Sequence, residues 1–473
     1  MTFPNVLVLN YLKQTKQASP EIQLKAENYI ALGYQRLLTF EVQGGGFSLY
    51  GRAPASVMLS AKGLLEFSDM AKVYPVDPAL IQRTRNWMLA QQKSDGTWTT
   101  GASSWDAPPG SANDPLPLTA YVTWAILESG LKDDARIGRA IAYIKENSAR
   151  ANDGYTLAMV ANALVAYDPN DPMTRDALAR LNALQVAEGD GVYYPTKIGS
   201  FTGAYGVYGN IETTGLAAYA FVRAKQYPEA AQRALTYLVQ KKDPRGTWGS
   251  TQATILALRA LIQSVIEAGE VAGDAIVRVS ANGAESNPIV ITKENAGVVQ
   301  IVSFDDINPG TNRIAFKVDG KGALAYQVSS NYYLPWSAVP VTPEADKLVD
   351  IQVRYDRTTL AVNDEVGVTA TVRLTKAGTA RMTIVDLGIP PGFTVQSEDL
   401  DAAVRAKTIA RYELTGRQII VYLEEFSSQK PITFNYRLKA KFPLRAQAPS
   451  SATYDYYNPS VTSAQAPTTL TVR

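Results

Sequence analysis

The stretch NVLVLNYLKQTKQASPEIQLKAENYIALGYQRLLTFEVQGGGFSLYG, residues 5–51, decides the fold of the first half of the chain. Its beginning carries apolar residues at helical spacing, namely Val6, Leu7, Leu9 and Leu12. Ser19 as N-cap and Pro20 in the first helical position then predict the start of a second helix. That helix is expected to run to about Phe40, before glycines 44–46, on the apolar residues Ile22, Ala26, Ile30, Leu32, Tyr34 and Leu37. The stretch is therefore predicted to fold as two helices and a glycine-rich loop.

Turns that combine glycine with an aromatic residue recur along residues 1–267, at 45–47, 95–98, 153–155, 190–193 and 245–248. Most of them precede an apolar, alanine-rich helix, at 56–67, 118–130, 155–167, 213–224 and 253–265, and more polar helices such as 79–92 and 229–242 lie between. A repeat of roughly 40 to 60 residues with two helices per unit predicts an α/α array or a closed α/α toroid, with the apolar helices as the inner ring. We interpret the turns as structural, with glycine in a left-handed cap and the ring filling a gap.

After a break in composition at 268–273, the pattern changes to the alternation of β-strands. Strands are predicted at 275–283, 288–293, 298–304, 312–320 and 323–333, with tight turns at Asn282-Gly283 and Asp319-Gly320. Residues 268–335 are thus expected to form a small β-unit and 336–346 a proline-containing linker. Residues 347–473 are predicted as a β-sandwich, with one helix at 397–413 that starts at Ser397 as N-cap.

The composition excludes several functional classes. The chain has 473 residues, 46% of them hydrophobic and 19% charged, which is typical of a soluble protein of several domains. A net charge of +2 without a Lys/Arg cluster gives no indication of nucleic-acid binding. The sequence contains no Cys and no His, so thiolate chemistry, disulfides and histidine ligands are excluded, and we expect no cofactor and no metal. We also find no apolar run long enough to span a membrane and no signal peptide.

Three segments of the first half resemble the thioester domain of the alpha-2-macroglobulin and complement superfamily: PNVLVLNYL at 4–12, GYQRLL at 33–38 and GGFSLYG at 45–51. The last part resembles the macroglobulin, or receptor-binding, domain of that superfamily in IPPGF at 389–393, RYE at 411–413, VYLEEF at 421–426 and YDYYNP at 454–459. The resemblance implies that 268–335 is the second part of a CUB-type β-domain. It also implies that the family's Cys-x-Glu-Gln thioester motif precedes Met1.

The resemblance implies that the chain is the C-terminal fragment of an alpha-2-macroglobulin-like endopeptidase inhibitor of bacterial type, and not an enzyme. Its partners would be proteases, with receptor binding left open, and its location would be extracellular, periplasmic or at the cell surface. Some family members place a His in the loop that here spans 100–117, and that His directs acyl transfer to hydroxyl groups. Because this sequence has none, the resemblance implies transfer to amines.

In this family, tyrosines of the terminal domain cover the thioester. The resemblance gives Tyr412, Tyr456 and Tyr457, beside Tyr454, as candidates for this shielding role, and strand alternation would place Tyr456 and Tyr457 on opposite faces. The alternative is that these rings belong to the sandwich core. Lys407 falls near the family's receptor-binding lysines, although a solvated helix face explains it as well.

Two other functions stay open. A carbohydrate-active enzyme on an α/α toroid would need a pair of carboxylates, for which the candidates are Asp106, Asp114, Asp153, Asp190 and Glu212. Most of these residues occupy turn or cap positions, and two carboxylates within reach of each other in a pocket would be required. A macroglobulin without a thioester would instead be a non-covalent binding or structural module.

Overall fold

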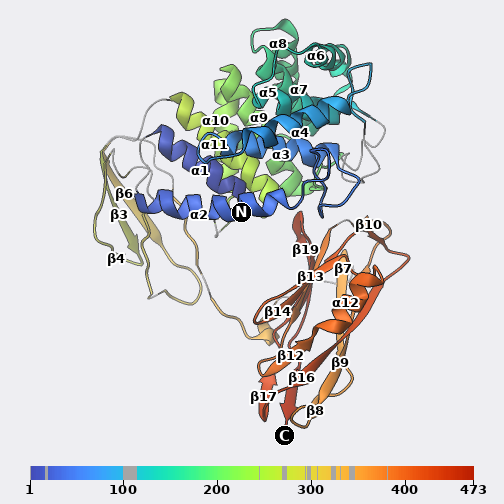
Figure 1. Cartoon of the computed structure of the whole chain (residues 1–473). Helices are drawn as coiled ribbons and strands as arrows, with labels where there is room; N and C mark the ends of the chain where they lie inside the picture. Colours follow the sequence, from blue (N-terminus) through green and yellow to red (C-terminus); the bar gives the residue numbers. More distant parts are fainter. Residues whose placement is uncertain are drawn as a thin grey trace. The chain divides into compact units, whose positions relative to one another are not determined.

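The computed structural model describes residues 2–15, 20–99, 114–243, 246–268, 274–292, 295, 300–305, 307–320, 326–330, 332–339, 347–380 and 382–473 (Figure 1). The chain divides into two compact units, Met1–Ser329 and Ser330–Arg473. Among the described residues, no helix has both the length and the apolar character needed to cross a lipid bilayer.

The first unit is a closed ring of helices. Its inner helices are α1 (Thr2–Gln14), α3 (Val57–Met70), α5 (Leu116–Glu128), α7 (Gly154–Tyr167), α9 (Gly206–Ala224) and α11 (Thr251–Ala268). Each inner helix contacts the next one, and α11 contacts α1, so the ring closes. The outer helices α2 (Pro20–Leu38), α4 (Pro78–Ala90), α6 (Ala135–Asn147), α8 (Pro172–Ala183) and α10 (Pro228–Gln240) each pack on the inner helix that precedes them. The predicted α/α toroid is confirmed.

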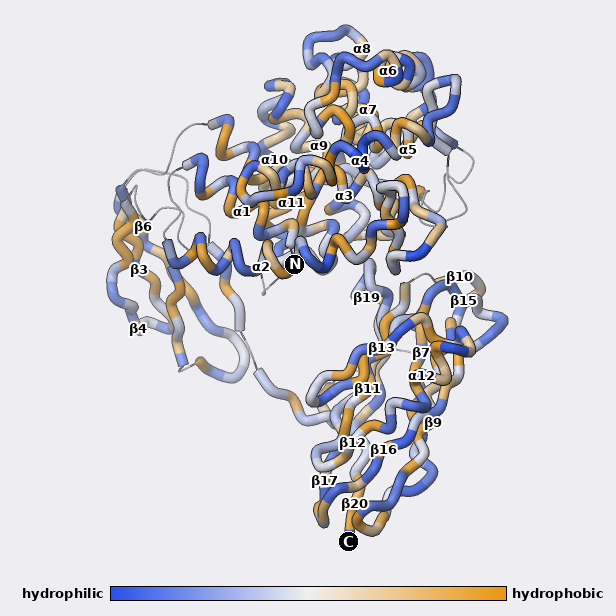
Figure 2. Tube along the Cα trace, viewed as in Figure 1, coloured by the Kyte–Doolittle hydropathy of each residue, from blue (hydrophilic) through white to orange (hydrophobic). Residues whose placement is uncertain are grey.

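Burial follows the predicted division between inner and outer helices. Nearly every residue of α7 is buried, which its many alanines permit because small side chains let neighbouring helices approach closely. In the outer helix α6, burial is confined to one stripe at helical spacing, namely Ile137, Ala140, Ile141 and Ile144. Figure 2 shows the same contrast, with the apolar colour concentrated in α5 and α7 and the hydrophilic colour in α4.

The two helices of residues 5–51 are present, but the second differs from its prediction. All four predicted apolar residues of α1 are buried, together with Phe3. In α2, which begins at Pro20 as expected, only Ala26 and Ile30 are buried, and Leu32 is 67% exposed. The predicted apolar face of α2 is therefore wrong in part, because an outer helix touches the ring along a narrow stripe only. The predicted cap Ser19 lies outside the described residues.

A small sheet follows α11. Strand β3 (Ala275–Ala281) is its centre and pairs antiparallel with β4 (Ala284–Glu285), β5 (Ile289–Ile291) and β6 (Ile314–Gly320). Asn282 and Gly283 form the predicted tight turn, with φ of 51° and 93°. The strands predicted at 298–304 and 323–333 are wrong in their described parts, because 300–304 and 326–330 form no strand. The tight turn predicted at Asp319-Gly320 is also wrong, because both residues lie inside β6 and pair with β3. A short hairpin of β1 (Val186–Glu188) and β2 (Gly191–Tyr193) lies between α8 and α9.

The second unit is the predicted β-sandwich. One sheet has the order β13 (Arg411–Leu414), β14 (Gln418–Leu423), β11 (Thr383–Gly388), β18 (Ser451–Asp455) and β19 (Asn458–Gln465). The other has the order β12 (Phe393–Gln396), β16 (Ile432–Ala440), β9 (Glu365–Leu374) and β7 (Val349–Tyr355). Smaller sheets join β10 (Thr379–Ala380) to β15 (Phe426–Ser427), and β17 (Leu444–Gln447) to β20 (Thr469–Val472) and β8 (Thr359–Leu360). Alternate residues of β9 and β16 fill the core: Val366, Val368, Ala370, Val372, Phe434, Tyr436, Leu438 and Ala440.

The helix of the sandwich is shorter than predicted. Helix α12 spans Ser397–Arg405, so Ser397 is its first helical residue, and the preceding Gln396 makes no side-chain cap. Lys407 takes a left-handed φ of 56° in the exposed turn that follows, so it is not on the helix. Arg411–Leu414 then forms β13, because this segment gains hydrogen bonds to β14 that a longer helix would give up.

Candidate functional site

Two of the glycine-aromatic turns have the same geometry and hold the ring together. Gly96 and its counterpart Gly246 both have a left-handed φ, of 89° and 81°. The Trp98 indole Nε1 donates to the Met88 carbonyl at 2.7 Å, and the Trp248 indole Nε1 donates to the Leu238 carbonyl at 2.6 Å. In both cases the acceptor lies ten residues before the tryptophan. Both tryptophans are buried. This geometry supports the structural interpretation of these turns.

The turn at 153–155 works differently. Asp153 is the N-cap of α7 and accepts hydrogen bonds from the backbone N–H of Tyr155 at 2.9 Å and of Lys197 at 2.6 Å. Gly154 is the first residue of the helix and needs no left-handed φ; a side chain there would instead meet the Pro195 carbonyl. Asp153 therefore fixes α7 to the loop before α9.

Arg259 on α11 lies where most of the inner helices converge. Its guanidinium forms a buried ion pair with Asp69 on α3. It also lies over three rings, at 5.4 Å from the centre of Phe3 on α1, 5.7 Å from Trp124 on α5 and 5.5 Å from Tyr219 on α9. Burial alone would raise the pKa of Asp69, but Arg259 and Lys72 outweigh it and hold that pKa below its usual value. One side chain thus joins five of the six inner helices.

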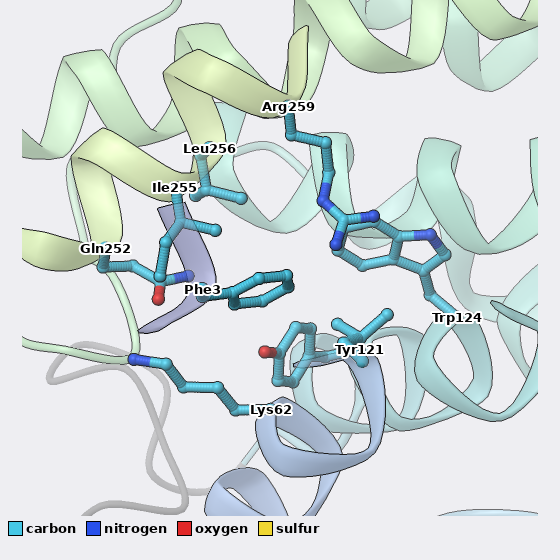
Figure 3. Close-up of a pocket in the computed structure, with 9 residues that line it drawn as sticks. Phe3, Lys62, Tyr121, Trp124, Gln252, Ile255, Leu256 and Arg259 are labelled. Carbon is cyan, nitrogen blue, oxygen red and sulfur yellow. The ribbon is translucent and has the colours of Figure 1, made fainter. Parts of the chain in front are cut away.

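A small cavity lies beside this cluster, next to the first turn of α1. Its volume is about 10 Å³, enough for one water molecule. The lining residues are Phe3, Lys62, Leu65, Tyr121, Trp124, Gln252, Ile255, Leu256 and Arg259. Figure 3 shows the Phe3 ring between Gln252 on one side and Arg259 on the other. The amide oxygen of Gln252 is buried and has no hydrogen-bond partner among the described residues.

Two carboxyl groups with shifted pKa values belong to the same region. Burial raises the pKa of Glu66 on α3 to about 7, although the nearby Lys62 opposes the shift. Burial likewise raises the pKa of Glu212 on α9 to about 7, although hydrogen bonds from the hydroxyls of Ser200 and Thr202 act to lower it. Thr202 Oγ1 donates to Glu212 Oε1 at 3.1 Å, whereas Oε2 has no hydrogen-bond partner in the described part of the chain. Both carboxyl groups can therefore exchange protons near neutral pH.

Lys62 completes the group, and burial lowers the pKa of its amine. Its position on α3 is four residues before Glu66, so both side chains leave the helix on the same side. Neither Lys62 nor Glu66 is among the site residues predicted from the sequence. The signal that could have found them is their charge within the largely apolar segment 56–67. Arg259 gives the same signal, because it is the one charged residue of segment 253–265.

The acidic residues proposed for a carbohydrate-active enzyme are not brought together. Asp114 accepts a hydrogen bond from the Leu116 backbone at 3.0 Å, and Asp190 is exposed in the turn between β1 and β2. Asp106 and most of the loop 100–117 lie outside the described residues. Glu212 is fully buried on the inner helix α9, and it does not line the cavity beside α1, which is itself far too small for a sugar. The described residues also hold no cluster of three His, Cys, Asp or Glu side chains that could bind a metal.

The three tyrosines of the terminal domain occupy two separate places. The Tyr412 hydroxyl on β13 donates to Asp401 on α12 at 2.7 Å, and this hydrogen bond, helped by burial, raises the pKa of Tyr412 to about 12. Tyr456 and Tyr457 form the turn between β18 and β19, with ring centres 4.9 Å apart and edge to face. The predicted strand alternation of this pair is wrong because neither residue lies in a strand. Strands β14 and β11 separate Tyr412 from the pair.

Comparison with known protein families gives two matches. The A-macroglobulin TED domain matches residues 1–263, and the A-macroglobulin receptor binding domain matches residues 378–466. Ovostatin from Gallus gallus is 23% identical over 477 residues, which cover 96% of this chain and 31% of ovostatin. Thioester-containing protein 1, allele R1, from Anopheles gambiae is 23% identical over 467 residues, covering 96% of this chain and 33% of that protein. The chain thus spans about a third of the length of these relatives.

Solved structures share the fold. Native alpha-2-macroglobulin from Escherichia coli, spanning domain MG7 to the C-terminus, superposes with a TM-score of 0.66 at 15% identity, covering 98% of this chain and 75% of that one. Salmonella alpha-2-macroglobulin reacted with methylamine gives a TM-score of 0.66 at 16% identity, covering 100% of this chain and 29% of that one. At this identity the likeness concerns the arrangement of helices and strands.

Proposed function

The chain belongs to the A-macroglobulin family, and on this basis we propose that it is the C-terminal part of an alpha-2-macroglobulin-like endopeptidase inhibitor that traps proteases without being an enzyme itself. The observation that carries the proposal is the order of domains along one chain. A closed α/α toroid that matches the TED domain is followed by a small β-sheet and then by a sandwich that matches the receptor-binding domain. A fold alone does not determine function, but this succession of domains is specific.

Covalent capture depends on a segment that this sequence does not contain. A thioester needs a Cys and a Gln side chain; the sequence has no Cys, and the family resemblance implies that both groups precede α1. In such a reaction an amine of the target attacks the thioester carbonyl, an amide forms and the thiolate leaves. Because the sequence has no His to accept the acyl group first, we propose that transfer goes directly to amines.

We further propose that at least one of Tyr412, Tyr456 and Tyr457 shields the thioester in the full-length protein. Two features support this role. All three residues are partly buried in the terminal unit, so part of each ring stays accessible, and Tyr412 also packs against the core of the sandwich. Tyr456 and Tyr457 are also held edge to face at the tip of a hairpin, where a rigid apolar surface is presented at little conformational cost. Since the trapped proteases would act outside the cell, we place the protein in the extracellular space, the periplasm or at the cell surface.

The test uses the full-length protein. Treatment with methylamine should release about one thiol per chain, measured with a chromogenic thiol reagent, and a variant without the thioester Cys should release none. Release would support covalent capture of proteases. An extended protein that carries no such Cys, or that releases no thiol, would refute covalent capture, and non-covalent binding by the macroglobulin domains would then be the function to test.

A further inference from the structure

Lys62 differs from the other lysines of the toroid in its surroundings. It lies on the inner helix α3 and lines the cavity beside the first turn of α1, where most of the wall is apolar (Figure 3). Its amine makes no hydrogen bond or ion pair within the described residues, whereas Lys13 and Lys72 are each paired with a carboxylate. The residue as a whole is half-buried, so the side chain is not completely enclosed.

The charged groups around Lys62 do not neutralise it by direct contact. Glu66 on the same helix and Glu212 on α9 act on it from a distance, and neither forms an ion pair with it. Arg259 on α11 lines the same cavity, but Asp69 binds its guanidinium. Among the described residues that line the cavity, the other titratable group is the phenol of Tyr121 on α5, whose pKa burial raises. Desolvation therefore dominates, and it favours the neutral amine over the ammonium ion.

From this placement we propose that Lys62 is a reactive amine of the toroid, which accepts acyl groups from thioesters at the N-terminal end of α1. An unpaired amine in an apolar wall is a nucleophile, because the neutral form carries the attacking electron pair. The Nζ electron pair attacks the thioester carbonyl, the N–C bond forms and the C–S bond breaks. The thiolate leaves, and the proton lost by Nζ passes to a neighbouring carboxylate or to water. The product is an amide on Lys62 together with a free thiol.

This inference rests on the proposed function only for its biological consequence. If the full-length protein carries a thioester just before α1, Lys62 is an internal acceptor that competes with the amines of the target. The reaction would then limit the time during which an exposed thioester can capture a protease. The reactivity of Lys62 itself can be measured on the present chain, without any thioester of its own.

The experiment treats the folded chain with a small thioester, N,S-diacetylcysteamine, and follows acetylation of each lysine by peptide mass spectrometry. Lys72 is the internal reference, because it follows the same helix, its side chain is 49% exposed and it pairs with Asp69 at 2.7 Å. We expect Lys62 to be acetylated several-fold faster than Lys72 at pH 7.5, because desolvation favours the neutral, nucleophilic amine at Lys62 whereas the ammonium group of Lys72 is held by Asp69.

Two controls separate reactivity from accessibility. In denaturant the rates at Lys62 and Lys72 should become equal, and Lys62→Arg should abolish the fast acetylation while the helical circular dichroism is kept. A rate at Lys62 in the folded chain that is equal to or below that of Lys72 overturns the inference, whether or not the Arg variant folds. That result would leave the methylamine test untouched, and failed thiol release would equally leave the acetylation result standing.

Discussion

Replacing Arg259 by Met should be among the most destabilising single changes in the toroid. The guanidinium and its partner Asp69 are 6% and 8% exposed, so the substitution leaves a buried carboxylate with Lys72 as its remaining cationic partner among the described residues. Breaking a buried ion pair by removing one partner costs about 3 to 5 kcal/mol. The cation–π contacts with Phe3, Trp124 and Tyr219 are lost as well, each worth about 0.5 to 2 kcal/mol, although Met retains part of the packing. We expect a loss of about 4 kcal/mol in the free energy of unfolding.

The assay is urea unfolding at pH 7 followed by tryptophan fluorescence. All tryptophans except Trp336 belong to Met1–Ser329, so the signal reports mainly on the toroid. The matched variants are Asp69→Asn, Arg259→Met and the double variant, which together form a double-mutant cycle.

The double variant should lose less than the sum of the single losses, because neither residue then remains as an unpaired buried charge. A loss below about 1 kcal/mol for Arg259→Met, or losses that add, would refute the argument that Arg259 joins the inner helices through a buried pair.

Three further predictions concern other parts of the ring. Burial raises the pKa of Glu212 from 4.5 to about 7, so its stabilising contribution is complete below pH 4.5 and is lost as the pH rises through about 7. As the pH rises from 5 to 8, the free energy of unfolding of the Glu212→Gln variant should therefore fall by about 3 kcal/mol less than that of the parent chain, measured by urea unfolding at each pH. An equal dependence of the two free energies on pH would contradict the raised pKa. Trp248→Phe leaves the Leu238 carbonyl without its indole donor and should cost about 1 to 3 kcal/mol in the same assay, whereas no loss would show that the turn needs only an aromatic ring. In Gly33→Ala the new methyl group on α2 would overlap the Thr2 side chain on α1, so the rate of amide hydrogen exchange in α1 should rise. Adding Thr2→Gly should restore the original rate. An unchanged rate in Gly33→Ala would mean that α1 and α2 can move apart without cost.

Much of the fold could be predicted because its signals are local. The buried face of α1, the alternation of β9 and β16 and the tight turn at Asn282-Gly283 each depend on spacing within a few residues. The errors fall where a distant segment decides. Residues 411–414 continue a helical pattern but pair with β14. Tyr456 and Tyr457 turn the chain because the Asp455 carboxylate accepts hydrogen bonds from the backbone N–H groups of Tyr457 and Asn458.

The sequence by itself determined the repeat of helices, the alternation of the sandwich strands, and the lack of Cys and His that limits the chemistry of the chain. Only the tertiary structure showed that Lys62 and Arg259 line one cavity beside the first turn of α1, and that Glu212 on α9 lies near enough to act on the charge of Lys62. Asp69 and Arg259 are 190 residues apart and lie on the inner helices α3 and α11. Helical periodicity tells which face of a helix is buried, but the closure of the ring decides which buried faces meet.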